Sequence, residues 1–225
     1  YRHSTTQGSI FKLVTAYTAL TQRYKSLGGR IANSSSLNPL EIIDEFRREG
    51  KDEFVGSHLN GKAIPRFYKG GRLPRSLSNN LGKMDIISAI ERSSNPYFAL
   101  LAGDILKDPD DLTKAAKMFS YGSKTGIELM HEISGNVPDD VSTDRTNLYF
   151  LSIGQGSLIV TPLQTAVMLS ALANGGKVLK PKILHLSIGR IPKRGEEILD
   201  TRPPFLFSDK MGYLGIDFPL FTEST

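Results

Sequence analysis

The sequence contains no cysteine among its 225 residues, which excludes structural disulfides and thiolate metal sites. Its four histidines, His3, His58, His131 and His185, are scattered without the spacing of metal ligands, so we expect no metal site. No apolar run approaches the ~20 residues of a membrane-spanning helix. The net charge is only +5, and no Lys/Arg cluster alternates with aromatic residues. We therefore expect no nucleic-acid partner.

The chain also has no initiator methionine and no signal peptide, and it begins at Tyr1. This start predicts a piece of a longer protein. With 39% hydrophobic and 23% charged residues the composition is that of an ordinary globular protein. The length suits one large domain or two small ones. A mildly basic surface fits an anionic partner, including polymers and lipid headgroups.

What the sequence does contain is a serine and a lysine three residues apart, Ser9 and Lys12, at the start of a helical pattern. Such a pair lies on one helix face. A serine hydroxyl is a poor nucleophile until a neighbouring base takes its proton. Lysine can be that base only where burial or a cationic neighbour lowers its pKa by roughly 3 units. Alone, the pair fits an exposed lysine beside a helix start better than a catalytic pair.

Apolar residues at helical spacing predict a largely buried helix over residues 9–25, which Gly28 and Gly29 end. A second helix is expected from Met84 to Ile90. It runs into Ser93-Ser94-Asn95-Pro96, where proline suits the first turn of a new helix from Tyr97 to Leu106. Ser93 and Asn95 would then share a tight joint that aims both side chains into one cleft.

Further elements follow along the chain. A helix is expected from Asp108 to Gly122, and another over residues 161–174, with Thr161 and Gln164 forming a capping box. Strands are expected at Tyr149–Ile153 and Val178–Leu186. Residues 190–225 lose periodicity and stay unassigned.

Residues 30–80 are rich in Asn, Ser, Gly and basic residues and are interpreted as an insertion over the core. Within them only Pro39–Arg48 has a helical pattern. Loops are expected elsewhere, for example at Lys69-Gly70-Gly71.

Two other motifs are weighed and set aside. Lys124-Thr125-Gly126 matches a triad known from serine enzymes, but no strand pattern surrounds it, so we interpret it as a turn. Gly154-Gln155-Gly156 lacks the Gly-Lys-Ser/Thr of a phosphate loop, so we interpret it as a turn before the Thr161 helix.

Taken in order, these segments resemble the transpeptidase domain of a penicillin-binding protein, closest to the monofunctional class B enzymes. Residues 8–12 resemble the nucleophile motif, with Gln7 where proline is usual, and residues 90–98 resemble the second motif. Residues 119–129 resemble a family turn that precedes the third motif. Residues 153–156, 161–166 and 173–176 also match in order and spacing.

The resemblance implies an α/β fold of the α+β type, a helical cluster packed on an antiparallel sheet. It implies a partial transpeptidase domain over residues 1–189, with residues 30–80 as an insertion and 190–225 as an unassigned tail. The family's Lys-Thr-Gly strand lies well downstream of residues 173–176, and no such triad follows Gly176. We therefore expect the domain to be incomplete at its C-terminus, or its tail to have diverged. Since this strand provides part of the oxyanion hole, its loss threatens activity.

The resemblance also implies a peptidoglycan D,D-transpeptidase that needs no cofactor. Ser9 would attack the carbonyl between two D-Ala residues of a stem peptide, with Lys12 as general base. Ser93 would relay protons, Asn95 would position Lys12, and both would contact the substrate. β-Lactams would acylate Ser9 as substrate mimics.

Further implications are cell-wall synthesis machinery as a partner and a location at the outer face of the bacterial cytoplasmic membrane, held by an N-terminal anchor that this chain lacks. Two alternatives stay open. One is a β-lactam sensor or β-lactamase-like protein, which fast β-lactam turnover would support. The other is a non-catalytic fragment or scaffold, which the absent third motif favours.

Overall fold

The computed structural model describes residues 1–31, 33–183 and 212–213. Its helices are η1 (Gly8–Phe11), α1 (Lys12–Ser26), η2 (Ser34–Leu37), α2 (Ile86–Glu91), α3 (Asn95–Leu100), η3 (Leu101–Ile105), α4 (Asp110–Met118), α5 (Arg145–Leu151) and α6 (Pro162–Ala173). Its strands are β1 (Ile42–Glu49), β2 (Asp52–His58), β3 (Ala63–Pro65), β4 (Phe67–Tyr68), β5 (Gly71–Arg72), β6 (Asn80–Met84), β7 (Leu179–Lys180) and β8 (Gly212–Tyr213).

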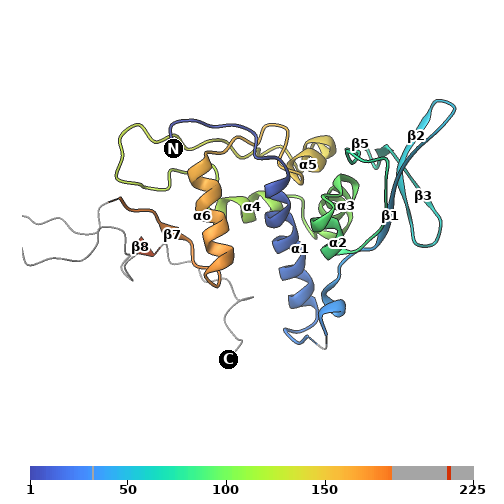
Figure 1. Ribbon diagram of the computed structural model, residues 1–225, viewed down its shortest axis with the longest axis horizontal. Helices are drawn as coiled ribbons and strands as arrows, with labels where there is room; N and C mark the ends of the chain where they lie inside the picture. The colour runs from blue at the N-terminus through green and yellow to red at the C-terminus, as the bar shows by residue number, and fades with distance from the viewer. Residues whose placement is uncertain (32, 184–211, 214–225) are drawn as a thin grey trace, which may run out of the picture.

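Helix α1 lies at the centre of the molecule (Figure 1). Helices α4 and α6 are on one side of it, and α2 and α3 are on the other, with the β1–β2–β3 sheet beyond them. The first half of α1 is buried, including Val14 and Ala19, whereas its last turn is exposed. The expected helix over residues 9–25 is thus confirmed, with burial confined to the half that follows Ser9.

The main sheet is antiparallel, with the strand order β3-β2-β1-β6. The prediction of a helix over Pro39–Arg48 is wrong, because β1 occupies most of it. In β1 the side chains of Ile42 and Asp44 are buried while that of Glu45 is exposed, which is the two-residue period of a strand. A two-residue turn at Gly50 then pairs β1 with β2.

The predicted strand at Tyr149–Ile153 is also wrong, because these residues form the end of α5 and the turn after it. Asp144 caps this helix by accepting hydrogen bonds from the backbone N–H groups of Thr146 and Asn147. Helix α6 is confirmed, with the expected capping box of Thr161 and Gln164. Of the expected strand Val178–Leu186, Leu179 and Lys180 form β7, and residues 184–186 lie outside the described part of the chain.

The other expected helices are present as α2, as α3 continued by η3, and as α4. Of the expected loop at residues 69–71, Lys69 and Gly70 form the two-residue turn between β4 and β5, and Gly71 begins β5. Both Lys69 and Gly70 have positive φ there, as a tight hairpin turn requires. The unassigned residues 190–225 lie outside the described part except for β8.

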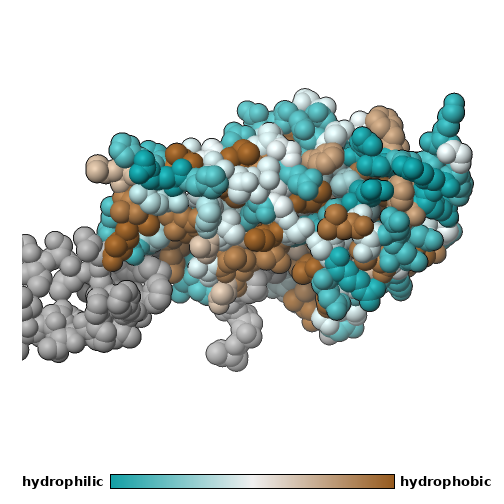
Figure 2. Space-filling model, turned by 45° about the horizontal axis from the view of Figure 1, so that its top comes forward, coloured by the Kyte–Doolittle hydropathy of each residue, from teal (hydrophilic) through white to brown (hydrophobic). Residues whose placement is uncertain are grey.

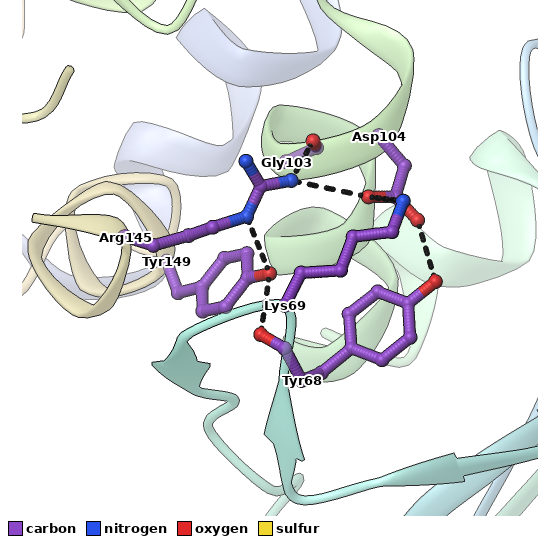
Figure 3. A network of polar contacts seen from close by, with 6 residues as sticks. All are labelled: Tyr68, Lys69, Gly103, Asp104, Arg145 and Tyr149. Atoms are coloured by element: carbon purple, nitrogen blue, oxygen red, sulfur yellow. Dashed lines mark hydrogen bonds and ion pairs between the residues drawn. The ribbon is translucent and has the colours of Figure 1, made fainter. Parts of the chain in front are cut away.

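A polar network fastens this small hairpin to the helices (Figure 3). Asp104, in the wide turn η3, accepts hydrogen bonds from the Tyr68 hydroxyl at 3.0 Å and from Lys69 Nζ at 2.8 Å. Arg145, at the start of α5, donates to the Gly103 carbonyl and lies 3.3 Å from the Asp104 carboxylate. Its Nε also donates to the Tyr149 hydroxyl at 3.0 Å. The network therefore joins the hairpin, η3 and α5 into one unit.

The surface at the hairpin end of the molecule is largely hydrophilic (Figure 2). Exposed charged residues gather at the tip of the β1–β2 hairpin, namely Arg47, Arg48, Glu49, Lys51 and Asp52. Within the described ranges, no helix has both the length and the apolar character needed to cross a membrane.

Candidate active site

Ser9 lies in η1, the tight turn that leads into α1, and its side chain is exposed. The turn is held from behind by Gly154, whose carbonyl accepts a hydrogen bond from the Gly8 N–H at 2.8 Å. A side chain on Gly154 would collide with the Gly8 carbonyl and the Phe11 side chain. Gly154 also has a φ of +73°, so glycine meets two requirements here. The turn after α5 thus fixes the position of the Ser9 backbone.

Ser93 and Asn95 lie at the joint between α2 and α3. Helix α2 ends in a Schellman motif, in which the Ser93 N–H bonds to the Ile90 carbonyl and the Ser94 N–H to the Ala89 carbonyl. The left-handed position of this motif usually holds glycine, but here it holds Ser93, with a φ of +58°. A non-glycine residue in this conformation costs about 1 kcal/mol or more. The position therefore keeps a side chain at an energetic cost, as functional sites do.

The structure brings all four predicted residues together. Lys12 Nζ donates hydrogen bonds to the Ser93 carbonyl at 2.8 Å, to Ser93 Oγ at 2.8 Å and to Asn95 Oδ1 at 2.6 Å. Ser93 Oγ in turn donates to Ser9 Oγ at 3.0 Å. Within the described ranges no hydrogen bond joins Lys12 directly to Ser9. The geometry therefore offers a proton path from Ser9 through Ser93 to Lys12.

Lys12 is the buried member of this group, with 3% of its surface exposed. Burial lowers the pKa of its amine from 10.5 to about 8, and the negative charge of Asp44 opposes this shift. About a tenth of such an amine is neutral at pH 7 and able to accept a proton. The Phe98 ring, 5.7 Å from Nζ, forms part of the apolar wall around it.

Sequence reasoning missed two residues behind the joint, Asp44 of β1 and Ser76. Asp44 Oδ2 accepts hydrogen bonds from Ser76 Oγ at 2.7 Å and from Ser94 Oγ at 2.5 Å. Both residues are almost fully buried. A charge inside the run Ile42-Ile43-Asp44 was the available signal, since an acidic residue in a strand's buried face is uncommon. Because that segment was predicted to be a helix, the buried position of Asp44 was not recognised.

The two motifs that the sequence predicts to be turns, at residues 124–126 and 154–156, have structural roles. Thr125 of the triad at residues 124–126 donates from its N–H and hydroxyl to the buried Glu132 carboxylate, at 2.7 and 2.6 Å. No strand includes this triad, and no hydrogen bond joins it to Ser9, Lys12, Ser93 or Asn95 in the described part. The turn at residues 154–156 supports η1. Among the described residues, no group of three or more acidic, histidine or cysteine side chains could hold a metal ion.

Comparison with known proteins gives a family match and several relatives. Residues 71–201, more than half of the chain, match the model of the penicillin binding protein transpeptidase domain. Ser93 and Asn95 lie inside this match, and Ser9 and Lys12 precede it. The peptidoglycan D,D-transpeptidase MrdA of Salmonella typhimurium is 32% identical over 130 residues, which are 54% of this chain and 20% of that protein. Stage V sporulation protein D of Bacillus subtilis is 28% identical over 187 residues, 83% of this chain and 24% of that protein.

Two solved structures have a similar fold. The transpeptidase domain of penicillin-binding protein 3 from Burkholderia pseudomallei gives a TM-score of 0.57 at 17% identity, over 83% of this chain and 46% of that one. The complex between PBP2 and MreC from Helicobacter pylori gives 0.56 at 22% identity, over 80% and 29%. These similarities confirm the expected fold of helices and antiparallel sheet. The chain spans about a fifth of the length of the curated relatives it matches.

Proposed function

Because the chain belongs to the family of penicillin-binding protein transpeptidase domains, we propose that its protein is a peptidoglycan D,D-transpeptidase that works through an acyl-serine intermediate. The observation that carries this proposal is the hydrogen-bond path from Ser9 through Ser93 to Lys12. Relatives named as D,D-transpeptidases support the reaction class.

In the first half of the reaction, Ser9 Oγ attacks the carbonyl carbon between the two terminal D-Ala residues of a stem peptide. Once Lys12 is neutral, the hydrogen bonds along this path reverse: Ser9 Oγ passes its proton to Ser93 Oγ, and Ser93 passes its own proton to Lys12 Nζ. The lowered pKa of Lys12 makes this transfer feasible near neutral pH. The bond to the terminal D-Ala breaks, and the proton returns through Ser93 to the departing amine.

In the second half, the amine of a neighbouring stem attacks the acyl-enzyme carbonyl, the ester bond to Ser9 breaks, and the proton lost by the amine passes through Lys12 and Ser93 to Ser9 Oγ. Asn95 holds Lys12 through Oδ1, while its Nδ2 donates to the Arg75 carbonyl at 2.9 Å. That second bond fixes the side chain, so that the amide face beside the cleft contacts substrate. β-Lactams acylate Ser9 in the same way and then stay attached.

The same proposal includes the wider setting. Stem peptides and β-lactams are the ligands, and cell-wall synthesis machinery is the partner, for which the PBP2–MreC complex of Helicobacter pylori is the precedent. The place of work is the outer face of the cytoplasmic membrane. The domain division, with a partial transpeptidase domain over residues 1–189 and an insertion at 30–80, also stays a prediction.

Intact-mass analysis after incubation with penicillin tests the proposal. We expect one adduct per chain, on the peptide that contains Ser9, and none in Ser9→Ala. Ser78→Ala, which removes an exposed serine hydroxyl elsewhere, is the matched control and should label like the wild type. A folded wild type that forms no adduct, or a Ser9→Ala variant that still forms one, contradicts the proposed function.

A further inference from the structure

Asp44 is a buried carboxylate behind the candidate active site. It lies on β1, 1% of its surface is exposed, and its Oδ2 accepts hydrogen bonds from two serine hydroxyls, Ser76 and Ser94. Burial raises the pKa of Asp44, while Ser94, Ser76 and the charge of Lys12 lower it. A buried carboxylate costs free energy unless it is hydrogen-bonded and a positive charge balances it.

Ser76 and Ser94 connect Asp44 to the joint at residues 93–95 through hydrogen bonds. Ser76 Oγ accepts a hydrogen bond from the backbone N–H of Asn95 at 3.0 Å. Ser94 Oγ accepts one from the Tyr97 N–H at 3.3 Å and so caps α3. A hydroxyl has a single proton, and here each proton goes to Asp44. The lone pairs of both hydroxyls are therefore turned toward backbone N–H groups, those of Asn95 and Tyr97.

The charge of Asp44 is its second connection to the site, because it acts on Lys12. Lys12 forms no ion pair within 4 Å in the described part of the chain, and its three hydrogen bonds go to neutral acceptors. Asp44 supplies the negative charge that acts on Lys12 through space. The other charged groups nearby face elsewhere: Glu45 is exposed, the Arg75 guanidinium lies 5.0 Å from the Phe46 ring, and Arg92 donates to the Leu81 carbonyl.

We propose that Asp44 is a positioning residue of the acylation site, which fixes the Ser93–Asn95 joint through Ser76 and Ser94 and balances the charge of Lys12. This inference rests on the proposed function for its effect on rate. Asp44 itself touches no substrate, because two serines stand between it and the cleft. Its contribution reaches the reaction through the place of Asn95 and the protonation of Lys12.

The charge effect is tested with Asp44→Asn, which keeps the shape and removes the charge. The rate of penicillin acylation is measured against pH, and the lysine side chain is titrated by NMR of ¹³C-lysine-labelled protein, assigned with Lys12→Arg. We expect both midpoints to fall by about half a pH unit or more. Glu45→Gln removes one acidic charge from the exposed face of the same strand and should leave both midpoints unchanged. Equal midpoints in Asp44→Asn and Glu45→Gln overturn the charge effect.

The positioning effect is tested with Ser76→Ala, which keeps the Asp44 charge and removes one of the two bridging hydroxyls. We expect acylation to slow about tenfold. Circular dichroism is expected to stay that of the folded wild type. A rate within twofold of the wild type overturns the positioning effect. This variant also covers the case in which Asp44→Asn does not fold.

The two proposals fail in different ways. A wild type that is not acylated at Ser9 contradicts the proposed function, whereas the NMR titration still reports whether Asp44 controls Lys12. A wild type acylated at Ser9, with variants that behave like it, contradicts only the role of Asp44.

Discussion

The burial of Lys12 has a measurable consequence for stability. In the folded protein the pKa of Lys12 lies near 8, whereas the unfolded chain has the ordinary lysine value of 10.5. Between these two pH values the unfolded state binds more protons, so the free energy of unfolding rises with pH. Below about pH 8 both states are protonated, and above about 10.5 both are neutral. The complete pKa difference corresponds to about 3 kcal/mol.

Lys12→Met removes this titration, so the difference between the two proteins isolates it. From urea unfolding at several pH values between 7 and 10, we expect the wild type to gain about 2–3 kcal/mol relative to Lys12→Met. Lys25→Met, which removes an exposed lysine from the same helix, shows how far the rest of the chain contributes to the trend. A wild-type minus Lys12→Met difference that stays constant over this range refutes the argument that Lys12 is a buried amine with a lowered pKa.

Two further substitutions test the segments that hold the site in place. Gly154→Ala should destabilise the fold by more than 2 kcal/mol and slow penicillin acylation, because the new methyl group would collide with Gly8. Gly156→Ala, at a position with the same left-handed backbone but a nearest contact of 3.5 Å, should cost only about 1 kcal/mol. Equal losses of stability in thermal unfolding would show that the packing of Gly154 on Gly8 is unimportant. Thr161→Ala should cost about 1 kcal/mol by removing the cap of α6, and an unchanged melting temperature would argue against the capping box.

The elements that could be predicted from the sequence are those specified by neighbouring residues. Helix α6 is capped by Thr161, carries Pro162 and Gln164 in its first turn and is followed by two glycines, so its signals lie within or directly beside it. The joint at residues 93–95 was predicted for the same reason. Strand β1 was not, because its Ile42, Ile43 and Phe46 also fit a helical spacing and its partner β6 begins only at Asn80, far along the chain.

The residues of the candidate site also divide into those specified by local motifs and those placed by long-range contacts. Ser9, Lys12, Ser93 and Asn95 could be predicted because each lies in a short motif with its own local geometry. Asp44 and Ser76 were missed because their bonds to the joint span 50 and 19 residues of sequence and follow no motif. Only the antiparallel sheet brings Asp44 behind the joint. No Lys-Thr-Gly triad follows Gly176 in the sequence, and residues 184–211 and 214–225 lie outside the described part of the chain.

The two halves of the site come from distant segments, and α5 connects them. Its first residue, Arg145, is bonded to Gly103 and Asp104 of η3, which continues the helix that starts at Asn95. At its other end, the turn at Gly154 holds Gly8 beside Ser9. Between these ends, the Ser152 carbonyl accepts a hydrogen bond from Thr15 of α1 at 2.8 Å. A displacement of α5 would therefore move Ser9 relative to Asn95, and the 3.0 Å contact between Ser93 and Ser9 depends on this helix as much as on the serines themselves.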